Sequence, residues 1–332
     1  MKVIKDKFKK NPVRGMMAML LPVVFVILPV TLPRSNTRLT DAPPVVTLSR
    51  AETTQGGITG MELTLPSGIT PVSGSFAERK VSFFKGAETD TDATYHALLG
   101  ADLTDRPALQ LLELTLADGP KDKKSYYYSI AIEGGDFTVD RLTLPPEMVN
   151  PGKKARRRIR RERKDVAKAV QTESAADRLW ESPFIMPVSG KVTSSFGRRR
   201  ILNGQEKSPH SGVDIRTPKG RRIRASNRAR VAFTGYLYYT GKTVILDHGQ
   251  GLFTSYCHLS KIKVKKGDMV ARGKIVGLAG STGRSTGPHL HWSAKLQGAR
   301  VSPLDLVSIT EAILKNALQK RAPRQISEAM LR

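Results

Sequence analysis

Two short segments constrain the fold most, because they carry three of the six histidines and lie far apart in the chain. Residues 208–214 read Ser-Pro-His-Ser-Gly-Val-Asp, and residues 286–292 read Thr-Gly-Pro-His-Leu-His-Trp. The proline and glycine in the first segment favour a strand or loop over a helix. In the second segment, His289 and His291 are two residues apart, so both rings point to one side of an extended strand. The fold must therefore allow two extended segments to converge.

The residue types in these segments are typical zinc ligands. Imidazole nitrogens and carboxylate oxygens bind zinc, and a catalytic zinc site has three protein ligands and one open position. The two segments offer four candidates, which are His210, Asp214, His289 and His291. His258, on a further strand-like run, is a fifth candidate. A structural zinc site usually requires several cysteines, and Cys257 is the single cysteine of this chain.

The region from about Trp180 to Leu306 resembles the lysostaphin-type (LytM-like) zinc metallopeptidases, metallopeptidase family twenty-three, which cut peptide bridges of bacterial peptidoglycan. The resemblance rests on the order and spacing of six motifs. They are Ser195–Arg198, His210–Asp214, Leu246–Gly249, Tyr256–Leu259, Gly277–Gly283 and Gly287–His291.

The resemblance implies a role for each of these polar residues. His210, Asp214 and His291 would bind one zinc ion per chain. His258 and His289 would be unligated catalytic histidines that orient water, take its proton or stabilise the oxyanion. Tyr239 would stabilise the transition state, with Tyr236 and Tyr238 as close competitors for that role.

Charge is distributed unevenly along the chain. Residues 151–332 contain 38 Lys and Arg against 12 Asp and Glu, whereas residues 41–150 contain 9 against 16. A basic surface of this size favours the binding of polyanions, whether nucleic acid, anionic lipid or an acidic cell-wall polymer. Few aromatic residues interleave with the arginines, and the chain has features of an exported protein, so we expect no nucleic-acid partner.

Residues 1–35 are predicted to be an export signal or membrane anchor. Basic residues dominate the first 15 positions, and an apolar stretch runs from Met16 to Pro33. No small-residue cleavage site follows this stretch, which favours an uncleaved anchor in the inner membrane; a cleaved signal stays open. We expect the rest of the chain to lie in the cell envelope outside the cytoplasm, either periplasmic or secreted.

The remaining chain is predicted to be mainly β. Alternating runs separated by turn residues predict an N-terminal immunoglobulin-like β-sandwich over residues 45–148. A basic helical linker follows over 153–179, where ten basic residues fall between Lys153 and Lys168. Residues 180–307 are predicted to be the LytM-like antiparallel β catalytic domain, and 308–332 a helical basic tail.

The function predicted from these features is a zinc endopeptidase that hydrolyses peptide cross-links of peptidoglycan. One alternative remains open: a catalytically silent LytM-like domain that binds the cell wall and activates another wall hydrolase. His248, in a glycine-flanked turn, and the isolated His96 are interpreted as structural. Cys257 is interpreted as a small buried strand residue and not as a reactive thiol.

Overall fold

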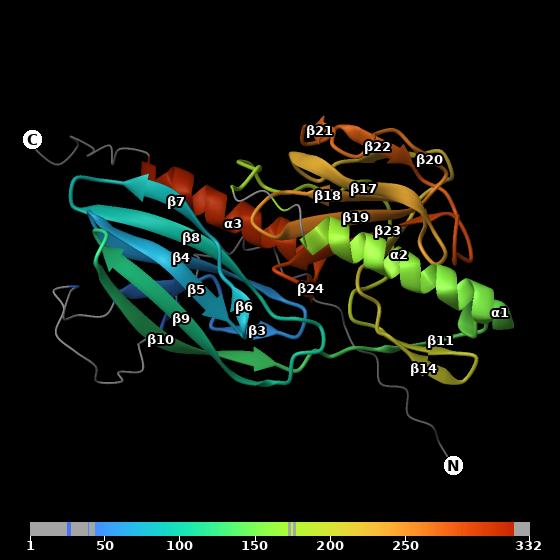
Figure 1. Ribbon diagram of the computed structural model, residues 1–332, viewed down its shortest axis with the longest axis horizontal. Helices are drawn as coiled ribbons and strands as arrows, with labels where there is room; N and C mark the ends of the chain where they lie inside the picture. Colours follow the sequence, from blue (N-terminus) through green and yellow to red (C-terminus); the bar gives the residue numbers. More distant parts are fainter. Residues whose placement is uncertain (1–24, 28–38, 40–43, 172–173, 175–176, 322–332) are drawn as a thin grey trace, which may run out of the picture.

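The computed structural model describes residues 25–27, 39, 44–171, 174 and 177–321, which form two β-rich units (Figure 1). The fold is mainly β, as the alternating runs predict. The N-terminal unit lies at one end of the molecule and the unit with the histidine motifs at the other.

Two five-stranded sheets build the N-terminal unit. The first has the order β1-β2-β4-β8-β7, formed by Phe25–Ile27, Val45–Leu48, Ile58–Pro66, Asp92–Gly100 and Phe83–Glu88. The second has the order β3-β10-β9-β5-β6, formed by Glu52–Thr54, Asp122–Glu133, Ala108–Asp118, Ile69–Phe76 and Arg79–Lys80.

Residues that alternate along these strands form one core between the two sheets. Met61, Leu63 and Leu65 of β4 are buried there together with Leu112 and Leu114 of β9. The order β2-β4-β8-β7 facing β10-β9-β5 is the order expected for a constant-type immunoglobulin sandwich. The immunoglobulin-like assignment itself stays a prediction.

The segment between the two units leaves the N-terminal sheets. Strand β11 (Val139–Leu142) lies inside the range predicted for the sandwich, but it pairs in parallel with β13 (Arg199–Leu202) of the C-terminal unit. The short helix α1 (Pro146–Val149) follows, and then α2 (Lys153–Gln171), a basic helix that is shorter than the helical linker predicted over 153–179. The chain therefore runs along the C-terminal unit before it enters that unit.

The C-terminal unit is built on an eight-stranded sheet. Its path β12-β15-β23-β19-β18-β17-β21 comprises Val192–Ser194, Val213–Arg216, His289–Leu296, Leu252–Leu259, Gly241–Asp247, Ala229–Leu237 and Met269–Val270, and β24 (Ala299–Val301) also pairs with β23. A three-stranded sheet has the order β16-β22-β20, formed by Arg222–Arg224, Ile275–Leu278 and Lys261–Ile262. Strands β13 and β14 (Gln205–Lys207) form a hairpin beside β11.

The two faces of the eight-stranded sheet are covered by different elements. Val244 and Leu246 of β18 belong to the core shared with the three-stranded sheet. Ile245, between them in the sequence, faces the other side, where it contacts the cluster that includes Val166 and Val170 of α2. Because side chains alternate across a strand, α2 and the three-stranded sheet lie on opposite faces.

Helix α3 (Pro303–Arg321) packs at the junction of the two units. Its residues Leu306, Ile309 and Ile313 are buried against Ile58 and Leu98 of the N-terminal sheets, in a cluster that also includes Trp180 and Phe184. The ion pair between Arg300 and Asp102, at 2.6 Å, also joins the two units. The C-terminal helix is thus a packed element in its first three turns, and residues 322–332 of the predicted basic tail lie outside the described residues.

Of the predicted export segment 1–35, the structure describes only Phe25–Ile27, which is strand β1 and pairs with β2. Within the described residues, no helix is both long and apolar enough to cross a bilayer.

Candidate metal centre

The centre is formed where strands β15 and β23 pair. Asp214 of β15 lies directly opposite His291 of β23 in the antiparallel register. Their sequence neighbours point into the apolar core on the other face of the sheet; these are Val213, Ile215, Leu290 and Trp292. Asp214 and His291 therefore point to the opposite face, the one on which α2 packs.

His210 precedes β15 and completes a cluster of three ligand atoms. His210 Nε2 lies 3.0 Å from Asp214 Oδ1 and 3.0 Å from His291 Nδ1, and the latter two atoms are 2.7 Å apart. These are the three residues that the family resemblance implies as zinc ligands. Ligand atoms around a tetrahedral zinc ion lie about 3.3 Å apart, as follows from bonds of about 2.0–2.1 Å. The cluster has the ligand types and the compactness that zinc requires.

Hydrogen bonding fixes the orientation of His210. Its Nδ1 lies 3.0 Å from the carbonyl oxygen of Ser195, to which an Nδ1–H donates, and Ser194 Oγ lies 3.1 Å away. This leaves a lone pair on Nε2 directed at Asp214 and His291. Three acceptor atoms then converge on one point, and a cation satisfies all of them at once.

Burial and the contacts between the ligands set the ionisation states of His210 and Asp214. Burial lowers the pKa of His210, with partial opposition from Asp214. Burial disfavours the charged form of Asp214, but the contacts with His210 and His291 outweigh it and hold the pKa of that carboxyl well below its usual range. Both residues are therefore in the ionisation state that metal binding requires at neutral pH.

Gly212 allows the ligand strands to approach each other. A Cβ atom at this position would lie 2.5 Å from the carbonyl oxygen of Trp292 and 2.8 Å from His291 Nε2. Both distances are shorter than a van der Waals contact. The glycine of the first motif is thus required by the position of a ligand in the second.

His258 and His289 lie beside the three ligands. Their ring centroids are 4.7 Å apart, and the His258 ring lies 6.0 Å from that of His291. His258 Nδ1 lies 2.7 Å from the carbonyl oxygen of Thr282, and His289 Nδ1 lies 2.8 Å from that of Gly287. An Nδ1–H donates in each case, so Nε2 is the proton-accepting nitrogen of both rings.

The backbone of His258 adopts a left-handed conformation with φ of 59°. Its amide donates to the carbonyl oxygen of Thr240 at 2.8 Å, which ties the end of β19 to the loop before β18. Burial lowers the pKa of His258 to about 3. The ring is therefore neutral near pH 7, and its protonated form is disfavoured.

Arg200 is a site residue that the sequence motifs do not reveal. Its Nη2 lies 3.4 Å from Asp214 Oδ2, on the far side of the carboxylate from the ligand atoms. Its Nε is buried without a hydrogen-bond partner among the described residues. The only sequence signal is the run of three arginines at 198–200, of which Arg200 lies in β13 opposite Lys207 of β14.

Tyr239 lies on the loop that contacts His258 through Thr240. The guanidinium of Arg284 lies 4.4 Å from the centroid of its ring, and the Arg284 amide donates to its carbonyl oxygen at 2.7 Å. Tyr238 instead donates its hydroxyl to the carbonyl oxygen of Glu147 at 3.1 Å. Tyr236 is 53% exposed. No hydrogen bond between described residues joins any of the three tyrosines to the ligand cluster.

A hollow of about 710 Å³ lies beside the ligands, and its lining includes Asp214, His289, Arg200 and Asp140. Asp140 belongs to β11, so the segment between the units lines part of the hollow. It accepts hydrogen bonds from Arg198 Nε at 2.7 Å and from Ser194 Oγ at 3.2 Å. Ser194 and Arg198, which both hydrogen-bond to His210, are thus held by the segment that enters from the N-terminal unit.

The other two histidines lie apart from the ligand cluster, whereas Cys257 pairs with His291 in the sheet but contributes no ligand atom. His248 is fully buried, with Nδ1 3.0 Å from the carbonyl oxygen of Arg228 and Nε2 2.8 Å from Thr254 Oγ1. His96 is buried in β8 of the N-terminal unit. Cys257 is buried and uncoordinated, and burial raises the pKa of its thiol to about 12.

Comparison with known proteins gives a match for residues 208–303 to peptidase family M23. The chain is 40% identical over 121 residues to the peptidoglycan DD-endopeptidase ShyA of Vibrio cholerae, a match that covers 36% of this chain and 28% of ShyA. It is 34% identical over 142 residues to the DD-carboxypeptidase/endopeptidase Mpg of Neisseria meningitidis, which covers 42% of this chain and 33% of Mpg. The chain thus matches about a third or less of the length of these relatives.

The likeness to solved structures extends beyond the matched segment. A crystal structure of a Pseudomonas aeruginosa protein assigned to peptidase M23 superimposes with a TM-score of 0.56 at 29% identity. The superposition covers 78% of this chain and 96% of the other. It therefore includes residues outside 208–303.

Proposed function

We propose that this chain, whose residues 208–303 are a peptidase family M23 domain, is a zinc-dependent endopeptidase that hydrolyses peptide cross-links of bacterial peptidoglycan. The observation that carries the proposal is the convergence of His210 Nε2, Asp214 Oδ1 and His291 Nδ1. Two further histidines, with their tautomers fixed by backbone carbonyls, lie beside these atoms. The substrate class is inferred from the relatives named as peptidoglycan endopeptidases.

The residues present fit a zinc ion with three protein ligands. A zinc ion held by His210, Asp214 and His291 would supply a Lewis acid for the scissile carbonyl and lower the pKa of a bound water. The carbonyl oxygen of Ser195 accepts a hydrogen bond from Nδ1–H of His210, so Nε2 of that ring is free to bind the metal. The core residues on either side of Asp214 and His291 hold the two strands in register.

Catalytic roles are assigned to His258 and His289. Each holds its own proton at Nδ1 on a backbone carbonyl, so Nε2 of each ring carries a lone pair that can accept a hydrogen bond from the attacking water. His289 Nε2 lies 3.8 Å from Asp214 Oδ1, close enough to take the proton of a water bound between them. The same imidazole can then return that proton to the leaving amine.

Arg200 and Tyr239 are assigned to the stabilisation of negative charge. The Arg200 guanidinium lies beside the carboxylate of Asp214 and lines the hollow next to it. A fixed cation in a buried site stabilises an oxyanion that develops nearby. The hydroxyl of Tyr239 is assigned the stabilisation of the transition state that the resemblance implies. Tyr238 and Tyr236 are the alternative residues for this role.

The location outside the cytoplasm is part of the same proposal. Peptidoglycan lies beyond the cytoplasmic membrane, and the basic and apolar residues of 1–35 are those of an export signal or anchor. The N-terminal unit would then hold the peptidase domain at a distance from the membrane.

The catalytically silent alternative makes a different prediction in the same experiment. The full-length chain is incubated with purified cross-linked peptidoglycan, with and without a zinc chelator, and the zinc content of the sample is measured. Release of uncross-linked peptides that stops with the chelator, at about one zinc per chain, supports the peptidase. Bound zinc without any hydrolysis, while added wall hydrolases become more active, would support the activator instead.

A further inference from the structure

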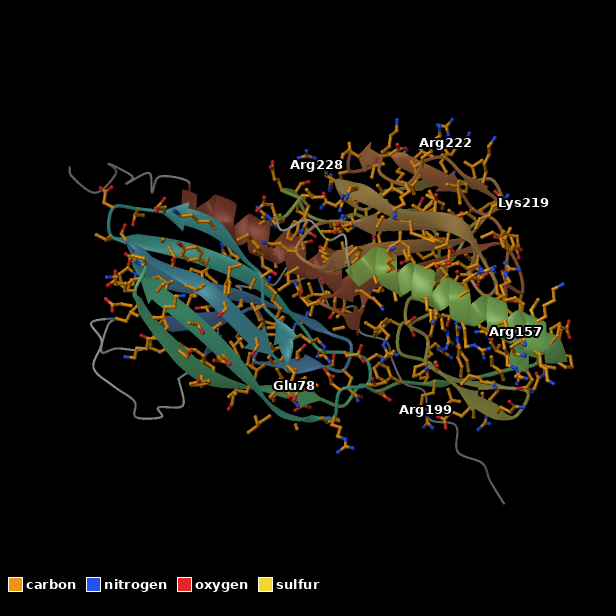
Figure 2. The ribbon with its side chains drawn as sticks, viewed as in Figure 1. Glu78, Arg157, Arg199, Lys219, Arg222 and Arg228 are labelled. Carbon is orange, nitrogen blue, oxygen red and sulfur yellow. The ribbon has the colours of Figure 1, made fainter. Side chains whose placement is uncertain are left out.

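Helix α2 presents an almost wholly basic surface. Nine of its lysines and arginines are exposed, whereas Asp165 is its only exposed acid; the basic residues are Lys153, Lys154, Arg156, Arg157, Arg160, Arg161, Arg163, Lys164 and Lys168. Figure 2 shows Arg157 on this helix, away from Lys219, Arg222 and Arg228 at the upper edge of the same unit. The one acid of the helix that is not exposed, Glu162, accepts from Arg158 at 2.6 Å.

The first half of α2 also borders a concave site. A hollow of about 1000 Å³ is lined by five cationic side chains and one aromatic ring, which are Lys153, Lys154, Arg157, Arg158, Arg161 and Tyr238. Arg158 is engaged by Glu162 and by the carbonyl oxygen of Tyr236. Among the described residues, no ion pair joins the other four cations to a carboxylate. The hollow thus has cations in excess of anions.

This hollow lies on the same side of the sheet as the metal centre. Val166 and Val170 of α2 pack against the cluster that includes Phe253 of β19. Phe253 is four residues before Cys257, which pairs with His291, so Phe253 and His291 share one face of the sheet. The wall of the hollow is also joined to the centre, because Tyr238 belongs to the loop whose Thr240 accepts from the His258 amide.

We propose that this basic surface, α2 with its hollow, binds carboxylate groups of peptidoglycan strands at a distance from the bond that is cut. The proposal rests on the proposed function for the identity of the polymer. Residues 153–168 span about 22 Å of helix, and the fields of neighbouring charges overlap because the Debye length is about 8 Å at physiological salt. Such a row attracts a polymer with repeated carboxylates far more strongly than a single small anion.

The shape of the surface favours a polymer strand over the other polyanions. A flat bilayer contacts the exposed ridge of a helix but does not fill a concave site. Single-stranded nucleic acid stacks its bases on free aromatic rings. Here the rings of Tyr236 and Tyr238 both face the Arg158 guanidinium, at 5.7 and 5.9 Å. A flexible chain with carboxylates can enter the hollow and needs neither a flat contact surface nor free aromatic rings.

The opposite face of the molecule supplies a matched control. Four exposed cations around the three-stranded sheet lie on the other side of the eight-stranded sheet; they are Arg222, Lys261, Lys263 and Lys274. The test variant changes Lys153, Lys154, Arg157 and Arg161 to Glu. The control variant changes the four cations around the three-stranded sheet to Glu. Both variants alter the net charge equally. A third variant with Gln at the four α2 positions removes the charges without reversing them.

The full-length chains are compared in two assays, co-sedimentation with insoluble peptidoglycan and hydrolysis of either insoluble peptidoglycan or a soluble cross-linked peptide dimer. Folding is checked by thermal unfolding. We expect the α2 Glu variant to lose tenfold or more of its sedimentation and of its activity on the insoluble polymer. Activity on the soluble dimer should stay within about twofold, and the control variant should stay within about twofold throughout. The α2 Gln variant should lie between wild type and the Glu variant.

Two results would overturn the binding proposal, and a third would overturn only the proposed function. An equal loss in the control variant would mean that net charge, and not this surface, attracts the polymer. Full sedimentation of the α2 variants, with loss of binding to anionic phospholipid vesicles or to DNA, would assign the surface to that partner. Wild-type chain that sediments with peptidoglycan but hydrolyses neither substrate would refute the proposed function and leave the binding proposal supported.

Discussion

His258 and His289 face each other at 4.7 Å between ring centroids, although they belong to different strands and only His289 lies in the same motif as a metal ligand. Each ring is held by one backbone carbonyl, that of Thr282 for His258 and that of Gly287 for His289. Both carbonyls belong to the loop that precedes β23. A single loop thus sets the tautomer of both rings.

The separation between ligand and proton-transfer roles predicts two different losses. His291→Ala should lose both zinc and activity, because it removes one of three ligand atoms. His289→Ala should keep zinc and lose about 10²-fold or more in kcat, the usual contribution of a general base. Zinc content and hydrolysis are measured on the same samples. If His289→Ala emptied the metal site, the division of roles between these two histidines would be wrong.

Gly212→Ala should impair metal binding although it replaces none of the three ligand residues. The new methyl group would lie 2.8 Å from His291 Nε2 and 2.5 Å from the carbonyl oxygen of Trp292, so the ring or the strand must move. We expect at least a tenfold loss of zinc affinity in a competition titration with a chelating dye. Gly204→Ala is the control for glycine loss in this region, since no atom lies within 4 Å of a Cβ there. That glycine has φ of 76°, so stability is compared separately.

Arg200→Gln should lower kcat by about 10²-fold with zinc retained, because a cation beside the developing oxyanion is lost. Arg200→Lys keeps the charge but not the planar guanidinium, and we expect it to recover part of the activity. The measurement is kcat on a soluble cross-linked peptide together with zinc content. Loss of zinc in both variants would mean that Arg200 serves only to position Asp214.

The roles of the neighbouring tyrosines can be separated by removal of single hydroxyl groups. Tyr239→Phe should lower kcat by about tenfold or more if its hydroxyl stabilises the transition state. Tyr238→Phe is the control, because that hydroxyl donates to the carbonyl oxygen of Glu147. The two variants are compared by kcat at saturating substrate. A loss confined to Tyr238→Phe would move the role to that residue.

His248 should make the fold sensitive to acid. Burial lowers the pKa of His248 to about 4 in the folded chain, whereas an unfolded histidine titrates near pH 6.5. The unfolded state therefore binds more protons between these values, and stability is lost as the pH falls from about 6.5 to about 4. The loss amounts to about 3 kcal/mol, at 1.36 kcal/mol for each unit of pKa shift.

His248→Gln should remove the part of this dependence that comes from His248, because glutamine does not titrate; His210 and His258, whose pKa values are also lowered, contribute equally in both chains. Urea unfolding of metal-free protein is measured at pH 7 and pH 4.5 for both chains, so that loss of metal in acid does not contribute. The comparison uses the change with pH and not the absolute stability, which the substitution also lowers. Equal changes in the two chains would show that another group controls acid unfolding.

The sequence by itself determined the chemistry of the centre and the type of structure around it. A two-residue histidine spacing fixes both rings on one side of a strand, as His289 and His291 are in β23. The same local logic predicted the β-rich fold and the basic helix, because period-two and helical patterns depend on near neighbours in the chain. The family motifs also identified the three residues whose ligand atoms converge.

Only the tertiary structure decided which other groups reach the centre. Arg200 is one of three consecutive arginines, and only the tertiary placement of β13, which pairs with β11 and β14, brings it to Asp214 of β15. The same holds for β11. This strand follows the N-terminal strands directly in the chain, but it pairs with β13 of the C-terminal unit. Contacts of this kind depend on which strand edges meet, and that is set by the packing of whole sheets. No spacing within a single segment records it.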